Sequence, residues 1–488
     1  MTIQKLIPDF EKYVIETQKK WKTPGLAVGI TQNNKIIYRQ GFGVKQLGTK
    51  DLVTPATIFQ IGSISKSFTA TLVAILVHEG KLKWHDKVID VLPDFRMYDP
   101  WVTREFTVED LLNHRTGLPF GVGLYLPFFG FDQNHLIHVL RYIKPASSFR
   151  LNFCYQNVPY IVAGKVIEKI TGKSWESNLQ ERIFKPLKMT SSSANFDAFK
   201  NSPHSTHLHT WDGDQVIPIP MDWSYHDWID VFGAGAGINS NIDDVLKWLN
   251  FQLDDTAANN KILPHAEKLR LHIPTTPAND QTLIMIDPKK WNIMTHYGLG
   301  WVCGDAKPCN IVYHVGGSLG NVTMAAFIPE EKLCITFLTN ARLLHAVALL
   351  RDLYDRYFGQ RQQNWSETIY TETQKTLVTE KKPPKSKIMH DLTKFAGIYH
   401  SDIYGNVTVK KNQGNLMLTI GPRKVKFDLV PWGNNTFKML WSNEAIVPSF
   451  MGNNPTFANF VCNHNNQVIT MSLTLLNYLD GLGEFKKE

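Results

Sequence analysis

The sequence predicts an α+β protein: an antiparallel β-sheet flanked by helices, an all-helical subdomain, and then a small C-terminal all-β, barrel-like domain. Apolar or alternating segments separated by turn residues fill residues 311–339, which is typical of an antiparallel meander. Helical apolar spacing marks residues 1–21 and 343–357, at the two ends of the larger domain. From about residue 389, short strands alternate with Asn/Gly turns, and this pattern indicates the second domain.

The length of 488 residues is too great for one ordinary hydrophobic core. We therefore predict a large domain over residues 1–362, a linker over residues 363–388 and a C-terminal domain over residues 389–488. The predicted linker contains the run Lys-Lys-Pro-Pro-Lys, which is typical of a solvated connection.

Composition narrows the class of protein. The hydrophobic share of 43% and the charged share of 20% are those of a soluble globular protein. Much of the net charge of +8 comes from lysines of the predicted linker, and no RNA- or DNA-binding motif is present, so we expect no nucleic-acid partner. No membrane span and no signal peptide are visible, which predicts a cytoplasmic protein, or a periplasmic or secreted one if a signal has been removed.

Five cysteines form an odd and sparse set, which argues against a disulfide framework. Whether Cys303 and Cys309 pair is left open by their spacing. His204, His207 and His209 are clustered, but a metal site needs three or four convergent ligands, and ordinary strand histidines are the better interpretation. The sequence therefore predicts no metal and no cofactor.

In chain order, a strand over residues 26–31 and a returning strand over residues 35–39 follow the first helix, with Asn33-Asn34 as the turn. Next comes the stretch around which the chain is organised, Gly62-Ser63-Ile64-Ser65-Lys66. The apolar run after it has helical spacing and ends near Gly80. Ser63 and Lys66 therefore lie on one face of a helix start, where free N–H groups and the helix dipole favour an alkoxide. A neutral amine beside a hydroxyl can activate it as a nucleophile.

Three later segments complete the large domain. Residues 107–112 form a capped short helix, and residues 121–131 are apolar and aromatic. The second segment is either core under a loop or a wall of a lipophilic substrate pocket. The Gly-Ala-Gly-Ala-Gly run of residues 233–237 lacks the ending of a phosphate loop, and its glycines let a backbone pass close to the site.

Three short motifs now stand in order, namely Ser63-Ile64-Ser65-Lys66, Tyr155-Gln156-Asn157 and His314-Val315-Gly316-Gly317. Together they resemble the serine β-lactamase and penicillin-binding protein superfamily. The Tyr-x-Asn form points to its class C branch, which includes esterases and D-aminopeptidases. Supporting signatures within residues 107–119, 167–172 and 297–301 extend the resemblance over most of the first 360 residues.

The resemblance implies roles for these residues. Ser63 attacks a carbonyl and forms an acyl-enzyme that water then hydrolyses. Lys66 or Tyr155 serves as the base; a phenol pKa depressed by Lys66 would favour Tyr155, and a coupled pair leaves the choice open. Asn157 binds Lys66 or the substrate amide. The backbone N–H groups of Ser63 and Gly317, the latter after Gly316 in the third motif, form an oxyanion hole.

His314 is the main departure, because the lactamase pattern has Lys at the start of the third motif. An ordinary imidazole is mostly neutral at pH 7, so it offers a substrate carboxylate only a conditional charge. We therefore expect a serine hydrolase acting on esters or peptides, of the esterase or D-amino-acid peptidase type. The alternatives are a β-lactamase or D,D-carboxypeptidase, and a non-catalytic penicillin-recognising or scaffold protein. The expected partner is a small ester, peptide or β-lactam-like molecule, and the C-terminal domain is a candidate for mediating oligomers.

Overall fold

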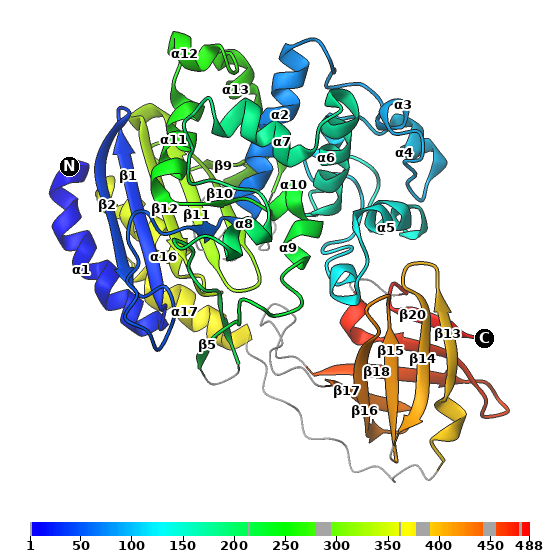
Figure 1. Cartoon of the computed structure of the whole chain (residues 1–488). Coiled ribbons are helices and arrows are strands. Elements are labelled where there is room, and N and C mark those ends of the chain that lie inside the picture. The colour runs from blue at the N-terminus through cyan, green and yellow to red at the C-terminus, as the bar shows by residue number, and fades with distance from the viewer. Residues whose placement is uncertain are drawn as a thin grey trace.

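The protein folds into an α+β body followed by a closed β-barrel (Figure 1). The computed structural model describes residues 2–212, 215–278, 294–360, 363–376, 391–412, 414–442, 455–477 and 481–488. This architecture confirms the predicted fold class, including the antiparallel sheet, the helical subdomain and the C-terminal barrel.

One eight-stranded antiparallel sheet is the centre of the larger body. Its strand order is β2-β1-β12-β11-β10-β9-β8-β7. The strands, in chain order, are β1 (Gly25–Gln32), β2 (Lys35–Gly43), β7 (Thr276–Pro277), β8 (Met294–Tyr297), β9 (Val302–Asp305), β10 (Ile311–Gly317), β11 (Val322–Ile328) and β12 (Leu333–Thr339). The strands β10, β11 and β12 form the predicted meander, and the first hairpin joins it through β1, which pairs with β12.

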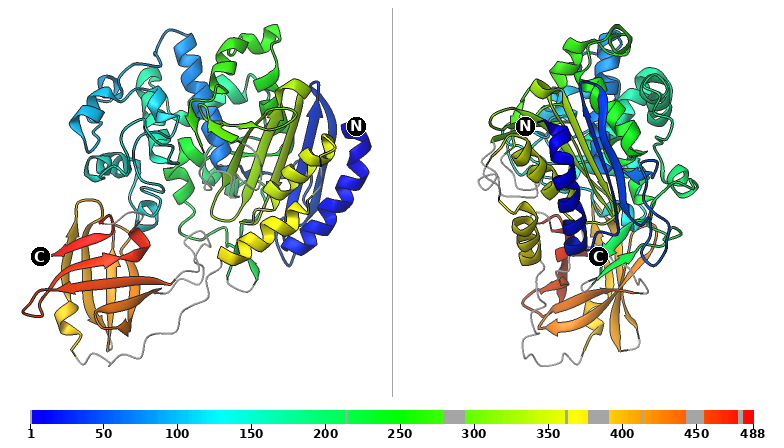
Figure 2. Two further views of the ribbon diagram at one scale, coloured as in Figure 1. Left: turned by 180° about the vertical axis from the view of Figure 1, so that it is seen from behind. Right: turned by 90° about the vertical axis from the view of Figure 1, so that its left-hand side faces the viewer.

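Helices cover both faces of this sheet (Figure 2). On one face lie the N-terminal helix α1 (Ile3–Trp21) and α16 (His345–Tyr357), whose apolar side chains share a core with the sheet. On the other face lie α2 (Ser65–His78), α11 (Ile242–Leu253) and α13 (His265–Leu271). Burial of both faces explains why β11 and β12 are apolar throughout and do not alternate.

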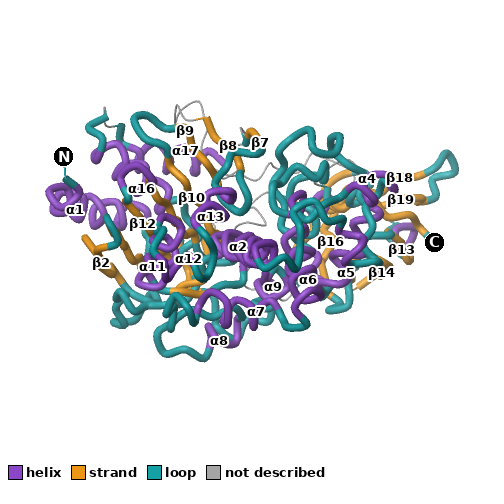
Figure 3. The backbone as a smooth tube through the Cα atoms, turned by 90° about the horizontal axis from the view of Figure 1, so that it is seen from above, coloured by secondary structure: helices purple, strands orange, loops and turns teal. Residues whose placement is uncertain are grey.

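The helical subdomain lies beside α2, as the view from above shows (Figure 3). Its central helix is α6 (Val158–Thr171), which packs on α2. The remaining helices are short: α3 (Val88–Val91), α4 (Pro100–Glu105), α5 (Gln133–His138), α7 (Trp175–Leu179), α8 (Phe196–Lys200), α9 (Trp228–Val231), α10 (Gly233–Ala236) and α12 (Ala257–Asn260). Two short strand pairs complete the body: β3 (Phe59–Gln60) with β6 (Asn239–Ser240), and β4 (His209–Trp211) with β5 (Val216–Pro218).

The segment predicted as a linker, residues 363–388, begins with a helix, α17 (Trp365–Thr376), so its first half departs from that prediction. The buried Trp365 indole donates to Asp355 Oδ2 at 2.6 Å, and Ser366 Oγ accepts from the Trp21 indole at 2.7 Å. Because these partners lie on α16 and α1, the helix extends the outer layer of the larger body. The second half of the predicted linker lies outside the described residues.

The C-terminal domain is a closed antiparallel barrel of eight strands. They are β13 (Gly397–Ser401), β14 (Gly405–Asn412), β15 (Asn415–Ile420), β16 (Val425–Gly433), β17 (Thr436–Trp441), β18 (Thr456–Cys462), β19 (Val468–Leu473) and β20 (Glu484–Lys487). The buried, inward-facing positions are apolar, and Tyr399, Phe427 and Phe460 form part of the packed interior.

The barrel contacts the helical subdomain at the apolar segment of residues 121–131. Arg423 donates its backbone N–H to the carbonyl of Phe129 at 2.9 Å, and His135 Nε2 donates to the carbonyl of Ile403 at 2.9 Å. The Arg423 guanidinium also pairs with Asp227, beside α9. Because buried apolar side chains run continuously from one domain to the other, the two share a core. No helix in the described part of the chain is long and apolar enough to cross a membrane.

Candidate active site

The Ser63 and Lys66 side chains meet at the start of α2. A single 3₁₀ turn, η1 (Gly62–Ile64), leads directly into that helix. Gly62 has a φ of +54°, a conformation that an L side chain rarely adopts, and its Cα lies against the backbone of Gly317. The glycine therefore allows Ser63 to enter the helix right beside strand β10. Ser63 is partly exposed, whereas Lys66 is fully buried.

The Lys66 amine has three polar neighbours. Its Nζ lies 3.0 Å from Ser63 Oγ, 2.7 Å from Asn157 Oδ1 and 2.9 Å from the carbonyl oxygen of Gly235. Burial holds the pKa of Lys66 well below its usual value. A neutral amine has two N–H donors and one lone pair. Because Asn157 and Gly235 present only acceptor oxygens to it, they can take both hydrogens and leave the lone pair for the Ser63 hydroxyl.

Tyr155 and Asn157 come from the segment that leads into α6. The Tyr155 hydroxyl is hydrogen-bonded to Ser63, and its ring centre lies 4.9 Å from Lys66 Nζ. The sequence had left open a Tyr155 pKa depressed by Lys66. Burial instead raises the pKa of Tyr155 well above its usual value, with the Ser63 hydrogen bond as a smaller opposing effect. Tyr155 is therefore a phenol here, able to donate a proton.

His314 lies on β10, as expected, but it is 1% exposed and faces the interior of the domain. Its Nδ1 lies 2.7 Å from the carbonyl of Val315, so Nδ1 carries the proton and donates. Its Nε2, 3.0 Å from the Tyr297 hydroxyl, then accepts. Burial and the nearby Lys66 lower the pKa of His314 to about 3. The conditional charge expected from sequence is therefore absent at pH 7.

Gly316 and Gly317 end β10 next to η1. A side chain on Gly316 would strike the carbonyl of Ile61 at 1.9 Å, and one on Gly62 would strike the Gly317 nitrogen at 2.5 Å. These contacts show that the two backbones run against each other at this point. The N–H groups of Ser63 and Gly317 thus belong to adjoining segments, as an oxyanion hole requires.

The apolar segment of residues 121–131 belongs to the core. Phe128 and Phe129 are each 1% exposed, and the Phe129 ring lies 6.4 Å from the ring of Tyr404 of the barrel. This favours the first of the two interpretations that the sequence left open. The clustered histidines form no metal site either: the described residues contain no group of three side chains able to hold a metal ion, and each of the five cysteines is a free thiol.

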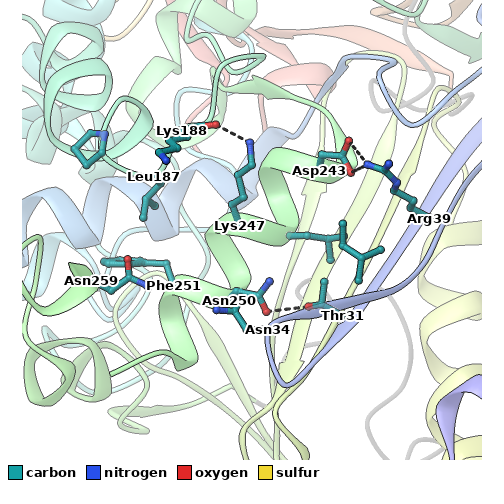
Figure 4. A pocket seen from close by; sticks show the side chains of 13 residues that line it. Thr31, Asn34, Arg39, Leu187, Lys188, Asp243, Lys247, Asn250, Phe251 and Asn259 are labelled. Atoms are coloured by element: carbon teal, nitrogen blue, oxygen red, sulfur yellow. Dashed lines mark hydrogen bonds and ion pairs between the residues drawn. The ribbon is translucent and has the colours of Figure 1, made fainter. Parts of the chain in front are cut away.

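A pocket of about 470 Å³ opens elsewhere, between the β1–β2 hairpin and α11 (Figure 4). Three of its charged side chains are already bound: Arg39 pairs with Asp243 at 2.9 Å, and Lys247 donates to the carbonyl of Lys188 at 2.6 Å. None of the predicted site residues lines it.

Four residues to which the sequence reasoning gave no individual role lie at the site or next to one of its residues. Gly235 supplies a carbonyl, and the earlier inference that its glycine run passes close to the site agrees with this contact. Tyr297 binds His314, and His114 packs on Tyr155 with ring centres 4.3 Å apart. Arg342 lies beside Gly317. His114 and Tyr297 fall within quoted signatures, whereas Arg342 belongs to no motif.

Comparisons with known proteins agree with this geometry. The family model described as Beta-lactamase matches residues 10–358, and a model described as a domain of unknown function, DUF3471, matches residues 381–482. Unguisins hydrolase ungD of Aspergillus violaceofuscus is 27% identical over 433 residues, which cover 81% of this chain and 75% of that protein. Penicillin-binding protein 4 of Amycolatopsis lactamdurans is 27% identical over 349 residues, covering 69% of this chain and 85% of that protein.

Two solved structures share the whole fold. The octameric penicillin-binding protein homologue from Pyrococcus abyssi superposes with a TM-score of 0.64 at 20% identity, covering 98% of this chain and all of that one. SurE superposes with a TM-score of 0.58 at 18% identity, covering 99% of each chain.

Proposed function

The chain belongs to the beta-lactamase family, and on that premise we propose that it hydrolyses esters or peptides through an acyl-enzyme on Ser63. The family relatives include hydrolases, which supports an enzyme. The observation that carries the proposal is the fully buried Lys66 amine, 3.0 Å from the Ser63 hydroxyl and with a lowered pKa. A desolvated amine in this position is a base poised to take the hydroxyl proton.

In the proposed mechanism, the lone pair of neutral Lys66 takes the Ser63 proton while Ser63 Oγ attacks the carbonyl carbon. Asn157 and Gly235 hold the two amine hydrogens, so the lone pair faces the hydroxyl. The developing oxyanion is bound by the N–H groups of Ser63 and Gly317, and loss of one such donor typically costs about 10²–10³-fold in rate.

Breakdown of the tetrahedral intermediate needs a proton on the leaving group. Tyr155 is suited to give it, because its raised pKa keeps it a phenol and its hydroxyl is bonded to Ser63. The Tyr155 phenolate then recovers, by way of water, the proton that Lys66 took from Ser63, because the acylated Ser63 oxygen has no hydrogen to pass on. Water attacks the ester by the reverse route and frees Ser63.

The substrate class is an ester or amide carbonyl, and peptides of D-amino acids are the first class to test. β-Lactamase or D,D-carboxypeptidase activity is the alternative. It calls for a cation near the third motif, which the neutral His314 does not supply. A purely binding role is disfavoured, because the contacts of Lys66 with Ser63 and Asn157 suit activation of the Ser63 hydroxyl.

The test is intact mass after exposure to a fluorophosphonate probe, with Ser63→Ala beside the unaltered protein. We expect one adduct on the unaltered chain and none on the variant. Ser65→Ala is the matched control, since Ser65 also lies at this helix start but donates to the Gly62 carbonyl. An adduct that survives in Ser63→Ala, or no adduct on the folded unaltered chain, would overturn the proposal.

A further inference from the structure

Tyr155, the proposed proton donor, lies outside regular secondary structure. It belongs to neither a helix nor a strand, since α6 begins only at Val158. Its hydroxyl is nevertheless hydrogen-bonded to Ser63, and the proposed proton transfer needs it to stay there. Contacts from another segment therefore have to hold the backbone of this motif in place.

The segment of residues 112–118 supplies those contacts. The carbonyl of His114 accepts from the backbone N–H of Cys154 at 2.8 Å. The Nδ1 atom of the same residue accepts from the backbone N–H of Gln156 at 3.2 Å. These two N–H groups stand on either side of Tyr155 in the chain, so one residue fixes the backbone before and after the proposed acid.

Further hydrogen bonds tie the same segment to the second motif and to α6. The Gln156 side chain accepts from Thr116 Oγ1 at 2.8 Å and donates to the carbonyl of Leu118. The Tyr160 hydroxyl donates to the carbonyl of Leu112 at 2.7 Å. The position of the segment is therefore set by the fold itself, before any substrate binds.

The His114 imidazole is an acceptor at Nδ1. The residue is fully buried, and burial together with the nearby Lys66 and His314 holds its pKa well below the usual value, so the ring is neutral. Because Nδ1 accepts from Gln156, the ring proton lies on Nε2, which has no hydrogen-bond partner among the described residues. Within that part of the chain, the bond to the second motif is thus the one hydrogen bond that this imidazole makes.

The backbone of His114 is strained. Its φ is +58°, in the left-handed region that residues other than glycine rarely adopt. Such residues persist where the surrounding contacts over-determine them, and they cluster at functional sites. Here the ring packs on the rings of Tyr155 and Tyr297, with centres 4.3 Å and 4.5 Å away. A glycine would relieve the strain, but it would remove the acceptor.

We propose that His114 is a positioning residue whose Nδ1 holds the backbone of Gln156, so that the Tyr155 hydroxyl stays aimed at the leaving group. The inference rests on the proposed acyl-enzyme function and adds to it a residue that does not touch the substrate. Loss of the acceptor should slow those substrates whose leaving group needs a proton. An alkoxide needs one to depart, whereas 4-nitrophenolate departs without it.

The kinetic test compares His114→Asn with His114→Gly. Both residues accept a positive φ, but only asparagine offers an oxygen close to the position of the imidazole Nδ1. For each variant, kcat/KM is measured with ethyl butyrate and with 4-nitrophenyl butyrate, two esters of one acid. His114→Gly should lower the ethyl-to-nitrophenyl ratio by about tenfold or more, because a misplaced catalytic group loses rate steeply. His114→Asn should keep the ratio of the unaltered protein.

The matched control is His345→Asn, which changes another buried, neutral imidazole and should leave the ratio unchanged. A loss of stability alone would lower kcat/KM for both esters together and would not move the ratio. Equal ratios in His114→Asn and His114→Gly, whether both unchanged or both lowered, overturn the proposal.

A second measurement needs no turnover and separates this inference from the proposed function. Hydrogen exchange followed by mass spectrometry should show faster amide exchange in peptides spanning residues 150–157 for His114→Gly than for His114→Asn, with thermal melting as the check that both are folded. Equal exchange in the two variants overturns the inference. Absence of a Ser63-dependent fluorophosphonate adduct on the unaltered chain overturns the proposed function instead.

Discussion

Two buried lysines, Lys66 in the site and Lys268 at the corner of α11 and α13, face similar desolvation in different surroundings. Lys268 donates to the backbone carbonyls of Phe251, at 3.0 Å, and of Asp254, at the end of α11. Burial lowers its pKa to about 8, while the nearby Asp254 and Asp255 act in the opposite direction. Carbonyls at a helix C-terminus favour a cation, so this ammonium caps the C-terminal end of α11.

Lys66 lies instead in the first turn of its helix, where the dipole disfavours a cation. One of its three partners is a hydroxyl, which can give up a proton. The comparison shows that burial by itself only lowers the pKa of an amine. The neighbouring groups then determine the role of the amine: backbone carbonyls make it a stabilising donor, whereas a hydroxyl gives it a proton to accept.

The largest expected effect comes from removing the site amine. Lys66→Met should lower kcat/KM by about 10²–10⁴-fold, the usual contribution of a general base, because no other amine faces Ser63 in the described chain. Steady-state hydrolysis of an activated ester measures the loss, and fluorophosphonate labelling should slow in parallel. Lys268→Met is the control in the same assay. A Lys66→Met protein that keeps more than a tenth of the original kcat/KM would contradict the role of Lys66 as the base.

Removing the corner amine should act on stability. Lys268→Met leaves the carbonyls of Phe251 and Asp254 without their donor, which should lower the free energy of unfolding by about 1–3 kcal/mol. Because Lys268 contacts no proposed site residue, kcat/KM should stay within about twofold, inside the range of neutral substitutions. Urea unfolding and the ester assay, run on one preparation, give the two numbers. A large rate loss with unchanged stability would reverse the assigned roles.

A smaller effect extends the comparison to buried imidazoles. Burial lowers the pKa of His345, which binds Thr17 and Thr23, to about 3. The unfolded chain, with an ordinary pKa of about 6.5, binds more protons, so stability present above that pH is lost as the pH falls toward 3. Between pH 6.5 and 5.5 one such residue should cost about 1 kcal/mol.

The measurement is urea unfolding at both pH values, with the His345→Gln variant beside the unaltered chain. The variant should lose less stability over this interval, since the titrating group is gone. Equal slopes in the two proteins would contradict a buried neutral His345.

Much of the fold follows from local pattern. The meander, the first hairpin and the helices α1, α2 and α16 could be predicted because the spacing of apolar residues within each segment indicates its secondary structure. Helix α17 was missed because its polar sequence is held by Trp365 and Ser366 against distant partners on α16 and α1. Closure of the barrel is likewise not a local property, since it pairs β13 with β20 at the opposite end of the domain.

The site divides in the same way. The Ser63–Lys66 spacing is local, so the sequence could predict their contact. Gly235 reaches Lys66 only through the tertiary fold, across 169 positions of the chain. The raised pKa of Tyr155 and the lowered pKa of His314 come from burial, which motif spacing does not encode. Arg342 is placed by the turn after β12 and had no motif to mark it.

The contact between the barrel and the segment 121–131 bears on how the protein can be dissected. Arg423 and Gly421 of the barrel lie directly on the backbone of Phe129, and the Tyr404 ring packs nearby. A fragment that ends before the barrel would uncover this apolar surface. Such a fragment would be prone to self-association, so domain exchange between relatives should move the barrel and residues 121–131 together as one cassette.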